Sequence, residues 1–112
     1  MPIMIGFARQ RRQLIEAEIA RIAEELPKLG VLRAWVSGEF ARGCIAPDTP
    51  LDLVLVHQTT EPAHRRSDFF VDHLRPRLDA TFAVYTPEEA ETLEQSDRVL
   101  IEAARLGEPI CG

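Results

Sequence analysis

The chain has 112 residues and a formal net charge of −5, with 46% hydrophobic and 28% charged residues. These values are typical of a globular protein and predict one domain covering residues 1–112. They exclude a disordered or low-complexity chain. Nucleic acid is not the expected partner, because an acidic chain lacks the basic surplus that nucleic-acid binders carry.

Two features bear on the compartment of the protein. The apolar run at the start of the sequence is soon followed by Arg9, Arg11 and Arg12, and it is too short for a signal peptide core or a membrane span. We therefore expect a cytoplasmic protein with no membrane partner, and we interpret the arginine cluster as a solvated helix face. Cys44 and Cys111 have no metal-type spacing and are predicted to be ordinary thiols.

The first half of the chain alternates between helical and extended patterns. Apolar residues at helical spacing predict an amphipathic helix over 7–26, ended by Pro27 and Gly30. A β-prone run over 31–36 stops at Ser37-Gly38, and one or two helical turns are expected over 39–42. The apolar side of the first helix would hold Leu14, Ile15, Ile19, Ile22, Ala23 and Leu26, and its polar side Glu16, Glu18, Arg21, Glu24 and Glu25.

The second half begins with a turn-rich loop over 46–50 and a strand over 51–56. This strand is apolar on both faces apart from Asp52, which predicts a central position in a sheet. Further along, Ser67 is expected to cap a helix over 68–74, and Thr86-Pro87-Glu88-Glu89 predicts a capped helix start. The remaining expected elements are a strand over 78–85, a helix over 96–106 and an extended piece at 109–110. This order predicts an α/β or α+β fold in which a small sheet packs with helices.

Asp52 resists a purely structural explanation. Burying an unpaired carboxylate costs several kcal/mol, so this residue needs a partner, a metal ion or an open site beside it. Upstream, the backbone amides of the Ser37-Gly38 turn could cradle phosphate oxygens. Downstream, Asp79 opens the next strand pattern and could face Asp52 if the two strands are neighbours. Two carboxylates beside a phosphate cradle would form a Mg²⁺ site.

The segments Gly38-Glu39-Phe40-Ala41-Arg42-Gly43 and Asp48-Thr49-Pro50-Leu51-Asp52-Leu53-Val54 carry a resemblance. They resemble the signature of the minimal nucleotidyltransferases of the polymerase β-like superfamily, and the resemblance covers nearly the whole chain. It implies a mixed sheet flanked by helices and transfer of a nucleoside monophosphate from a nucleoside triphosphate.

Residue by residue, the resemblance implies that Gly38, Glu39 and Arg42 occupy the nucleotide-binding positions. It also implies that Asp52 and Asp79 are the catalytic and metal-binding carboxylates, with ATP as substrate and Mg²⁺ as cofactor. Two positions depart from the family pattern. Glu39 replaces a serine that would donate a hydrogen bond to phosphate, and Pro50 replaces the first aspartate of the metal-binding pair. The sequence therefore supports one Mg²⁺ ion rather than two.

Three hypotheses follow, and the sequence leaves open whether the chain is an enzyme. In the first, it transfers AMP from ATP to a protein partner, as the antitoxin half of a pair with a helical HEPN-type protein. In the second, it is a catalytically inactive relative that acts as a protein-binding module. In the third, it is a structural domain whose Asp52 is neutralised by an arginine. A homodimer is compatible with all three, since a small domain with an exposed sheet edge often pairs.

Overall fold

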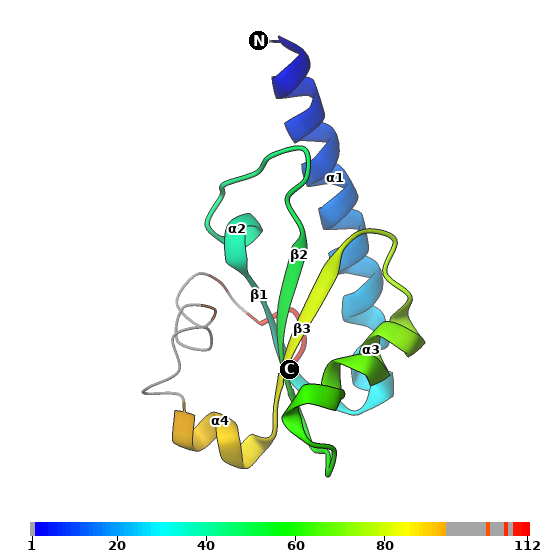
Figure 1. Cartoon of the computed structure of the whole chain (residues 1–112), viewed down its shortest axis with the longest axis vertical. Helices are drawn as coiled ribbons and strands as arrows, with labels where there is room; N and C mark the ends of the chain where they lie inside the picture. Colours follow the sequence, from blue (N-terminus) through cyan, green and yellow to red (C-terminus); the bar gives the residue numbers. More distant parts are fainter. Residues whose placement is uncertain (1, 94–102, 104–106, 108) are drawn as a thin grey trace.

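A computed structural model describes residues 2–93, 103, 107 and 109–112 of the chain. It shows an α+β fold, with a three-stranded sheet and helices packed around it (Figure 1). Short 3-10 turns at Pro27–Leu29 and Ala63–Arg65 precede the first strand and the third helix. The predicted fold class is confirmed. The strands are β1 (Val31–Ser37), β2 (Leu51–His57) and β3 (Ala80–Tyr85), and the helices are α1 (Pro2–Glu25), α2 (Gly38–Ala41), α3 (Arg66–Leu74) and α4 (Pro87–Leu93).

The sheet is mixed, and β2 is its central strand, as predicted. β1 pairs with β2 in the antiparallel sense, and β3 pairs with β2 in the parallel sense. The outer edge of β1 receives the predicted C-terminal extended piece, because the Ile110 N–H donates to the Ala34 carbonyl at 2.8 Å. Cys111 next to it is a free buried thiol whose pKa is raised by burial, and Cys44 is a free exposed thiol.

The two faces of the sheet bury different sets of side chains. One face carries Leu51, Leu53 and Leu55 of β2 and packs against α1 and α3. The other face carries Val54 and Val56 and packs against Ala90 of α4. This alternation follows from the period of two along a strand. It explains why β2 needs apolar residues at nearly every position, and it places Asp52 on the same face as Val54.

Helix α1 differs from the prediction in its start and in its faces. It begins at Pro2. Proline is tolerated there because the N–H groups of a first helical turn have no partner within the helix, so the missing N–H of proline costs no hydrogen bond. Leu14 is 44% exposed rather than buried, whereas Glu18 is only 3% exposed. Glu18 lies three residues after Ile15 and four before Ile22, so it occupies the face turned to the sheet. The N-terminal half of α1 extends beyond the ends of the strands (Figure 1). None of the described helices is long and apolar enough to cross a membrane.

Two other boundaries differ from the sequence prediction. Helix α3 begins at Arg66 without a side-chain cap, because a 3-10 turn leads into it, so Ser67 is its second residue and not its cap. Strand β3 begins at Ala80, two residues later than expected, although the Asp79 carbonyl still accepts a hydrogen bond from the Leu51 N–H. The helix predicted over 96–106 lies outside the described residues, apart from Ala103, which is helical and buried.

The predicted capped start of α4 is confirmed in detail. The Glu89 N–H donates to the Thr86 hydroxyl at 3.2 Å, and the Thr86 N–H donates to the Glu89 carboxylate at 2.9 Å. These reciprocal bonds satisfy two backbone donors at the helix start. The Arg66 guanidinium also binds the same carboxylate, and this interaction, more than any other, lowers the pKa of Glu89. The capping box therefore also fixes α4 to α3.

We expect Thr86→Ala to destabilise the protein by about 1 kcal/mol, the typical loss when an N-cap hydroxyl is removed. Urea unfolding followed by the fluorescence of Trp35 would measure it, because this single tryptophan packs on the sheet face that contacts α4. Thr92→Ala is the matched control. The Thr92 hydroxyl is exposed and bonds only within α4, so its loss should change the stability by less than about 0.5 kcal/mol. Equal effects of the two substitutions would contradict the capping role.

Candidate functional site

A row of three polar side chains crosses the sheet, with one from each strand. Ser37 of β1 pairs with Asp52 of β2, and Asp52 pairs with Thr81 of β3. Paired positions on neighbouring strands place their side chains on the same face. The row therefore forms the polar end of one sheet face. The next paired positions on that face are apolar, namely Trp35, Val54 and Ala83.

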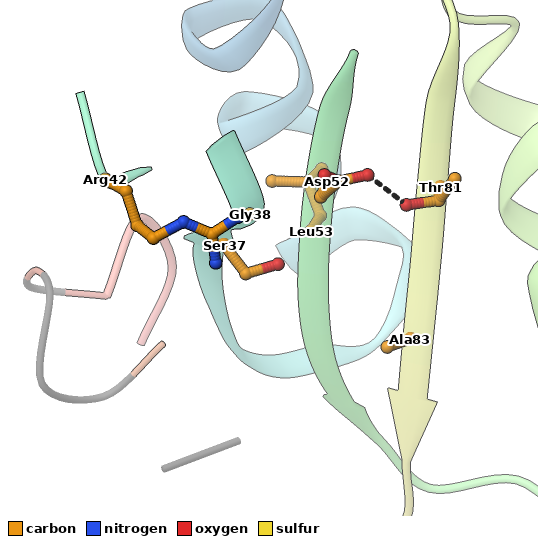
Figure 2. A pocket seen from close by; sticks show the side chains of 7 residues that line it. All are labelled: Ser37, Gly38, Arg42, Asp52, Leu53, Thr81 and Ala83. Carbon is orange, nitrogen blue, oxygen red and sulfur yellow. Dashed lines mark hydrogen bonds between the residues drawn. The ribbon is translucent and has the colours of Figure 1, made fainter. Parts of the chain in front are cut away.

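A cavity of about 240 Å³ lies over this polar row (Figure 2). Three of the predicted site residues line it, namely Gly38, Arg42 and Asp52. Tertiary structure thus brings together residues from the end of β1, the end of α2 and the start of β2. The other described residues that line it are Ser37, Leu53, Thr81 and Ala83.

Gly38 is required by its contact with Asp52. Its backbone has φ of +71°, a conformation that L residues with a side chain rarely adopt. A Cβ atom at this position would lie 3.0 Å from the Asp52 carboxyl carbon and would overlap one of the carboxylate oxygens. The absence of a side chain therefore lets the turn after β1 lie directly against the carboxylate.

Thr81 holds the Asp52 carboxylate from the opposite side. Its hydroxyl donates to Asp52 Oδ1 at 2.5 Å, and Figure 2 shows this bond between β2 and β3. Asp52 is half-buried, so the bond offsets part of the cost of taking a carboxylate out of water. Sequence analysis missed Thr81. Its alternation with Phe82 in the strand pattern puts it on the less apolar face, but only the register makes it the neighbour of Asp52.

Asp79 is not opposite Asp52. The two strands are neighbours, as the prediction required, but the parallel register pairs Asp52 with Thr81. Asp79 lies two residues earlier, just before β3, where it is exposed and does not line the cavity. The expectation that the two carboxylates face each other was wrong in its register. A shift of two residues keeps every side chain on the same face of the sheet, so the strand alternation does not distinguish the two pairings.

Glu39 is turned toward the loop that follows α2. Its carboxylate accepts a hydrogen bond from the Thr49 hydroxyl at 3.4 Å, and it does not line the cavity. Thr49 is fully buried and also accepts the Ala46 N–H at 2.7 Å, so this contact helps to close the loop. Pro50 directly precedes β2 and offers no ligand atom, and Asp48 is exposed in the same loop.

Arg42 brings a positive charge to the cavity. Its backbone N–H donates to the Gly38 carbonyl at 3.2 Å, which closes the single turn of α2. From there the side chain extends toward Ser37 and Gly38 (Figure 2). The cavity therefore combines an arginine, a carboxylate and two hydroxyl groups. A guanidinium beside hydroxyl groups is a common arrangement for binding phosphate oxygens.

The donor set limits the metal that this cavity could hold. Among the described residues, no group of three or more His, Cys, Asp or Glu side chains is placed to hold a metal ion together. One carboxylate with nearby hydroxyls does not make a closed protein cage. It suits Mg²⁺, which is commonly held by one or two carboxylates while phosphate oxygens and water complete its coordination.

Comparison of the chain with models of protein families, with curated proteins and with solved structures found no match. The chemistry of the cavity over the polar row is therefore the basis on which a function can be proposed. That chemistry is a phosphate-compatible site with one potential metal ligand.

Proposed function

We propose that this chain is a nucleotidyltransferase-like protein that binds the phosphates of ATP together with one Mg²⁺ ion. The observation that carries this proposal is the position of Asp52. A carboxylate in an otherwise apolar central strand opens into a cavity that also holds Arg42 and the Ser37-Gly38 turn. A half-buried carboxylate that borders such a cavity can act as a metal ligand while phosphate oxygens complete the coordination of the ion.

The residues of the cavity take separate roles in this proposal. Asp52 holds the metal ion, and Thr81 fixes the orientation of its carboxylate through their hydrogen bond. Arg42 and Ser37 bind phosphate oxygens. When bound, Mg²⁺ would neutralise phosphate charge. The volume of about 240 Å³ is small for a whole nucleotide, so the phosphates occupy the cavity and the base lies outside it.

The finer form of the proposal is transfer of AMP from ATP to a partner protein, with release of pyrophosphate. The partner would be a helical HEPN-type protein, with this chain as the antitoxin half of the pair. The support is the match of Gly38, Ala41-Arg42-Gly43 and Asp52 to the minimal nucleotidyltransferase pattern. Asp79, as the second carboxylate of that pattern, would have to reach the bound metal from its position before β3.

Calorimetry with ATP and Mg²⁺ tests the binding step. We expect ATP to bind in a Mg²⁺-dependent manner and Asp52→Asn to weaken binding by about 10- to 100-fold, because it removes the carboxylate charge but keeps the side-chain shape. Asp48→Asn is the matched control and should leave the affinity unchanged, since Asp48 is exposed in the loop and does not line the cavity. Absence of ATP binding to the unaltered chain, or equal affinities of the Asp52→Asn variant and the unaltered chain, would rule the proposal out.

The register favours a second candidate function. A threonine, not a carboxylate, lies opposite Asp52, and Pro50 contributes no ligand, so Asp52 is the one carboxylate among the described residues that line the cavity. A catalytically inactive relative that binds a partner protein does not need a second metal-binding carboxylate. Copurification of the chain with the product of the adjacent gene, followed by mass spectrometry of that product and by ATP-binding calorimetry of the chain, would separate the candidates. An AMP adduct on that protein, dependent on Asp52, supports transfer, and a stable complex without ATP binding supports the binding module.

A further inference from the structure

A second cavity lies between the N-terminal half of α1 and the loop after α2. Its volume is about 330 Å³, and it is lined by two arginines, Arg9 and Arg12, together with Ala8, Gly43 and Ile45. None of these residues lines the cavity over Asp52, although Gly43 is the chain neighbour of Arg42, which does. The sequence pattern predicts a solvated helix face at these arginines, and both are exposed.

The wall formed by the loop is held against the helix by Arg11. Its Nε donates to the Thr49 carbonyl at 2.7 Å across 38 residues of sequence. Thr49 in turn accepts the Ala46 N–H, so the loop is closed on itself and fixed to α1. The cavity is therefore bounded by two elements that are bonded to each other. It is more than a gap beside an exposed helix.

Within the described part of the chain, no carboxylate lines this cavity beside the two arginines, and Glu16, four residues after Arg12, is exposed outside it. No described carboxylate forms an ion pair with Arg9 or Arg12, although the chain as a whole has a net charge of −5. Arg9 and Arg12 are three residues apart, so their side chains are neighbours on the helix surface, where like charges destabilise a helix by a few tenths of a kcal/mol. A bound anion would relieve this repulsion.

The chemistry of two adjacent guanidinium groups selects among anions. Each guanidinium presents a planar fork that binds two oxygen atoms. A single carboxylate has two oxygens and can satisfy one fork, whereas a phosphate group has three terminal oxygens and up to two negative charges and can satisfy both. We propose that Arg9 and Arg12, with the Gly43–Ile45 loop, form a binding site for a phosphate group, separate from the cavity over Asp52. This inference does not depend on the proposed function.

Calorimetric titration with inorganic phosphate at constant ionic strength is the direct test. We expect one phosphate to bind and the double substitution Arg9→Gln with Arg12→Gln to weaken it by about tenfold or more, since a hydrogen bond to a charged group typically contributes that much. The matched control is Arg65→Gln with Arg75→Gln. It removes the same charge from two exposed arginines that lie outside the cavity and should have little effect.

Two further measurements make the outcome decisive. A short oligonucleotide with a 5′-phosphate, compared with the same oligonucleotide lacking it, shows whether the phosphate is recognised as part of a nucleic acid or as a small ligand. Tighter binding of the phosphorylated oligonucleotide, lost in the Arg9 and Arg12 variant, supports recognition of a phosphate that belongs to a nucleic acid. Binding of inorganic phosphate, without tighter binding of the phosphorylated oligonucleotide, supports recognition of a small phosphate ligand.

The proposal of a separate site is overturned if the unaltered chain binds no phosphate, or if both double variants lose phosphate equally. It is also overturned if the Arg9 and Arg12 variant loses affinity for ATP with Mg²⁺, because the cavity would then belong to the nucleotide site. Asp52→Asn should leave phosphate binding intact. A failure of ATP binding with phosphate binding preserved would therefore reject only the proposed function. Circular dichroism of each variant verifies that α1 remains folded.

Discussion

Gly38→Ala is expected to lower both the stability and the affinity for ATP. A residue with a Cβ at φ of +71° costs about 1–2 kcal/mol of conformational energy. The new methyl group would also overlap the Asp52 carboxylate, which adds about 1–3 kcal/mol of steric strain unless the carboxylate moves away. Movement of the carboxylate would weaken binding of ATP with Mg²⁺ by about 10- to 100-fold, the range found when the surroundings of a metal ligand are disturbed. Urea unfolding and calorimetry measure the two effects.

Gly43→Ala separates these two effects. Gly43 has a similar backbone conformation, with φ of +80°, but a Cβ placed there meets no atom within 4 Å. This substitution should therefore cost the same 1–2 kcal/mol or so of backbone strain and leave ATP affinity unchanged. Equal ATP affinities of the two alanine variants would contradict the idea that Gly38 is retained to accommodate Asp52. They would also weaken the assignment of Asp52 as the metal ligand.

Glu18→Gln is expected to cause a large loss of stability, about 3 kcal/mol, which corresponds to a fall of about 10–20 °C in the melting temperature. The Glu18 carboxylate is buried and accepts two hydrogen bonds from the Arg21 guanidinium, at 2.8 and 2.9 Å. It also accepts the backbone N–H of Arg77 at 2.9 Å, which ties α1 to the connection before β3. A neutral amide keeps the shape but loses the charge-assisted bonds.

The effect of Glu18 should depend on pH in a defined direction. Hydrogen bonds from Arg21, the largest cause, together with that of the Arg77 backbone, lower the pKa of Glu18 below its ordinary value of 4.5 despite burial. A lowered pKa means that the stabilisation is fully present above the pKa of the unfolded chain and is lost as pH falls through the folded-state pKa. The difference in unfolding free energy between the unaltered chain and Glu18→Gln should therefore be greatest near neutral pH and shrink below about pH 4.5.

Glu25→Gln is the control for Glu18. Glu25 lies on the same helix and pairs with Lys28 at 3.5 Å, but both side chains are substantially exposed. Its removal should cost less than about 1 kcal/mol and show little dependence on pH, because exposed ion pairs contribute little. Comparable losses from the two substitutions would show that burial is not what makes Glu18 important.

Local sequence patterns predicted most of the elements of this fold. The apolar run over 51–56 indicated a central strand, and the sheet order places β2 between β1 and β3. The Thr86-Pro87-Glu88-Glu89 pattern indicated a capped helix, and the reciprocal hydrogen bonds of Thr86 and Glu89 are present. These predictions succeed because strand alternation and helix capping depend on residues that are close together in the sequence.

The assignment of Glu18 to the polar side of α1 failed for a different reason. A charged residue in an amphipathic pattern is normally solvated, and an arginine three residues away fits an exposed ion pair as well as a buried one. Its position between Ile15 and Ile22 on one helix face was the available signal. Arg21, three residues later, supplies two of the hydrogen bonds that offset the cost of burial. The third comes from the N–H of Arg77, 59 residues away, and only the packing of α1 against the sheet brings it there.

The sequence by itself determined that Asp52 stands in a buried strand and that Gly38 and Arg42 belong to one turn beside it. The tertiary structure decided which residues accompany Asp52. The register places Thr81 opposite Asp52 and leaves Asp79 two residues away. A register shifted by two residues would keep the same alternation of faces, so the packing of the strands and not the strand pattern decides between the two. The tertiary structure also turned Glu39 toward Thr49 and placed Arg9 and Arg12 against the loop after α2. The second of these arrangements joins segments far apart in the chain, as the Arg11 bond to Thr49 across 38 residues shows, so it exists only once α1 has packed beside the loop.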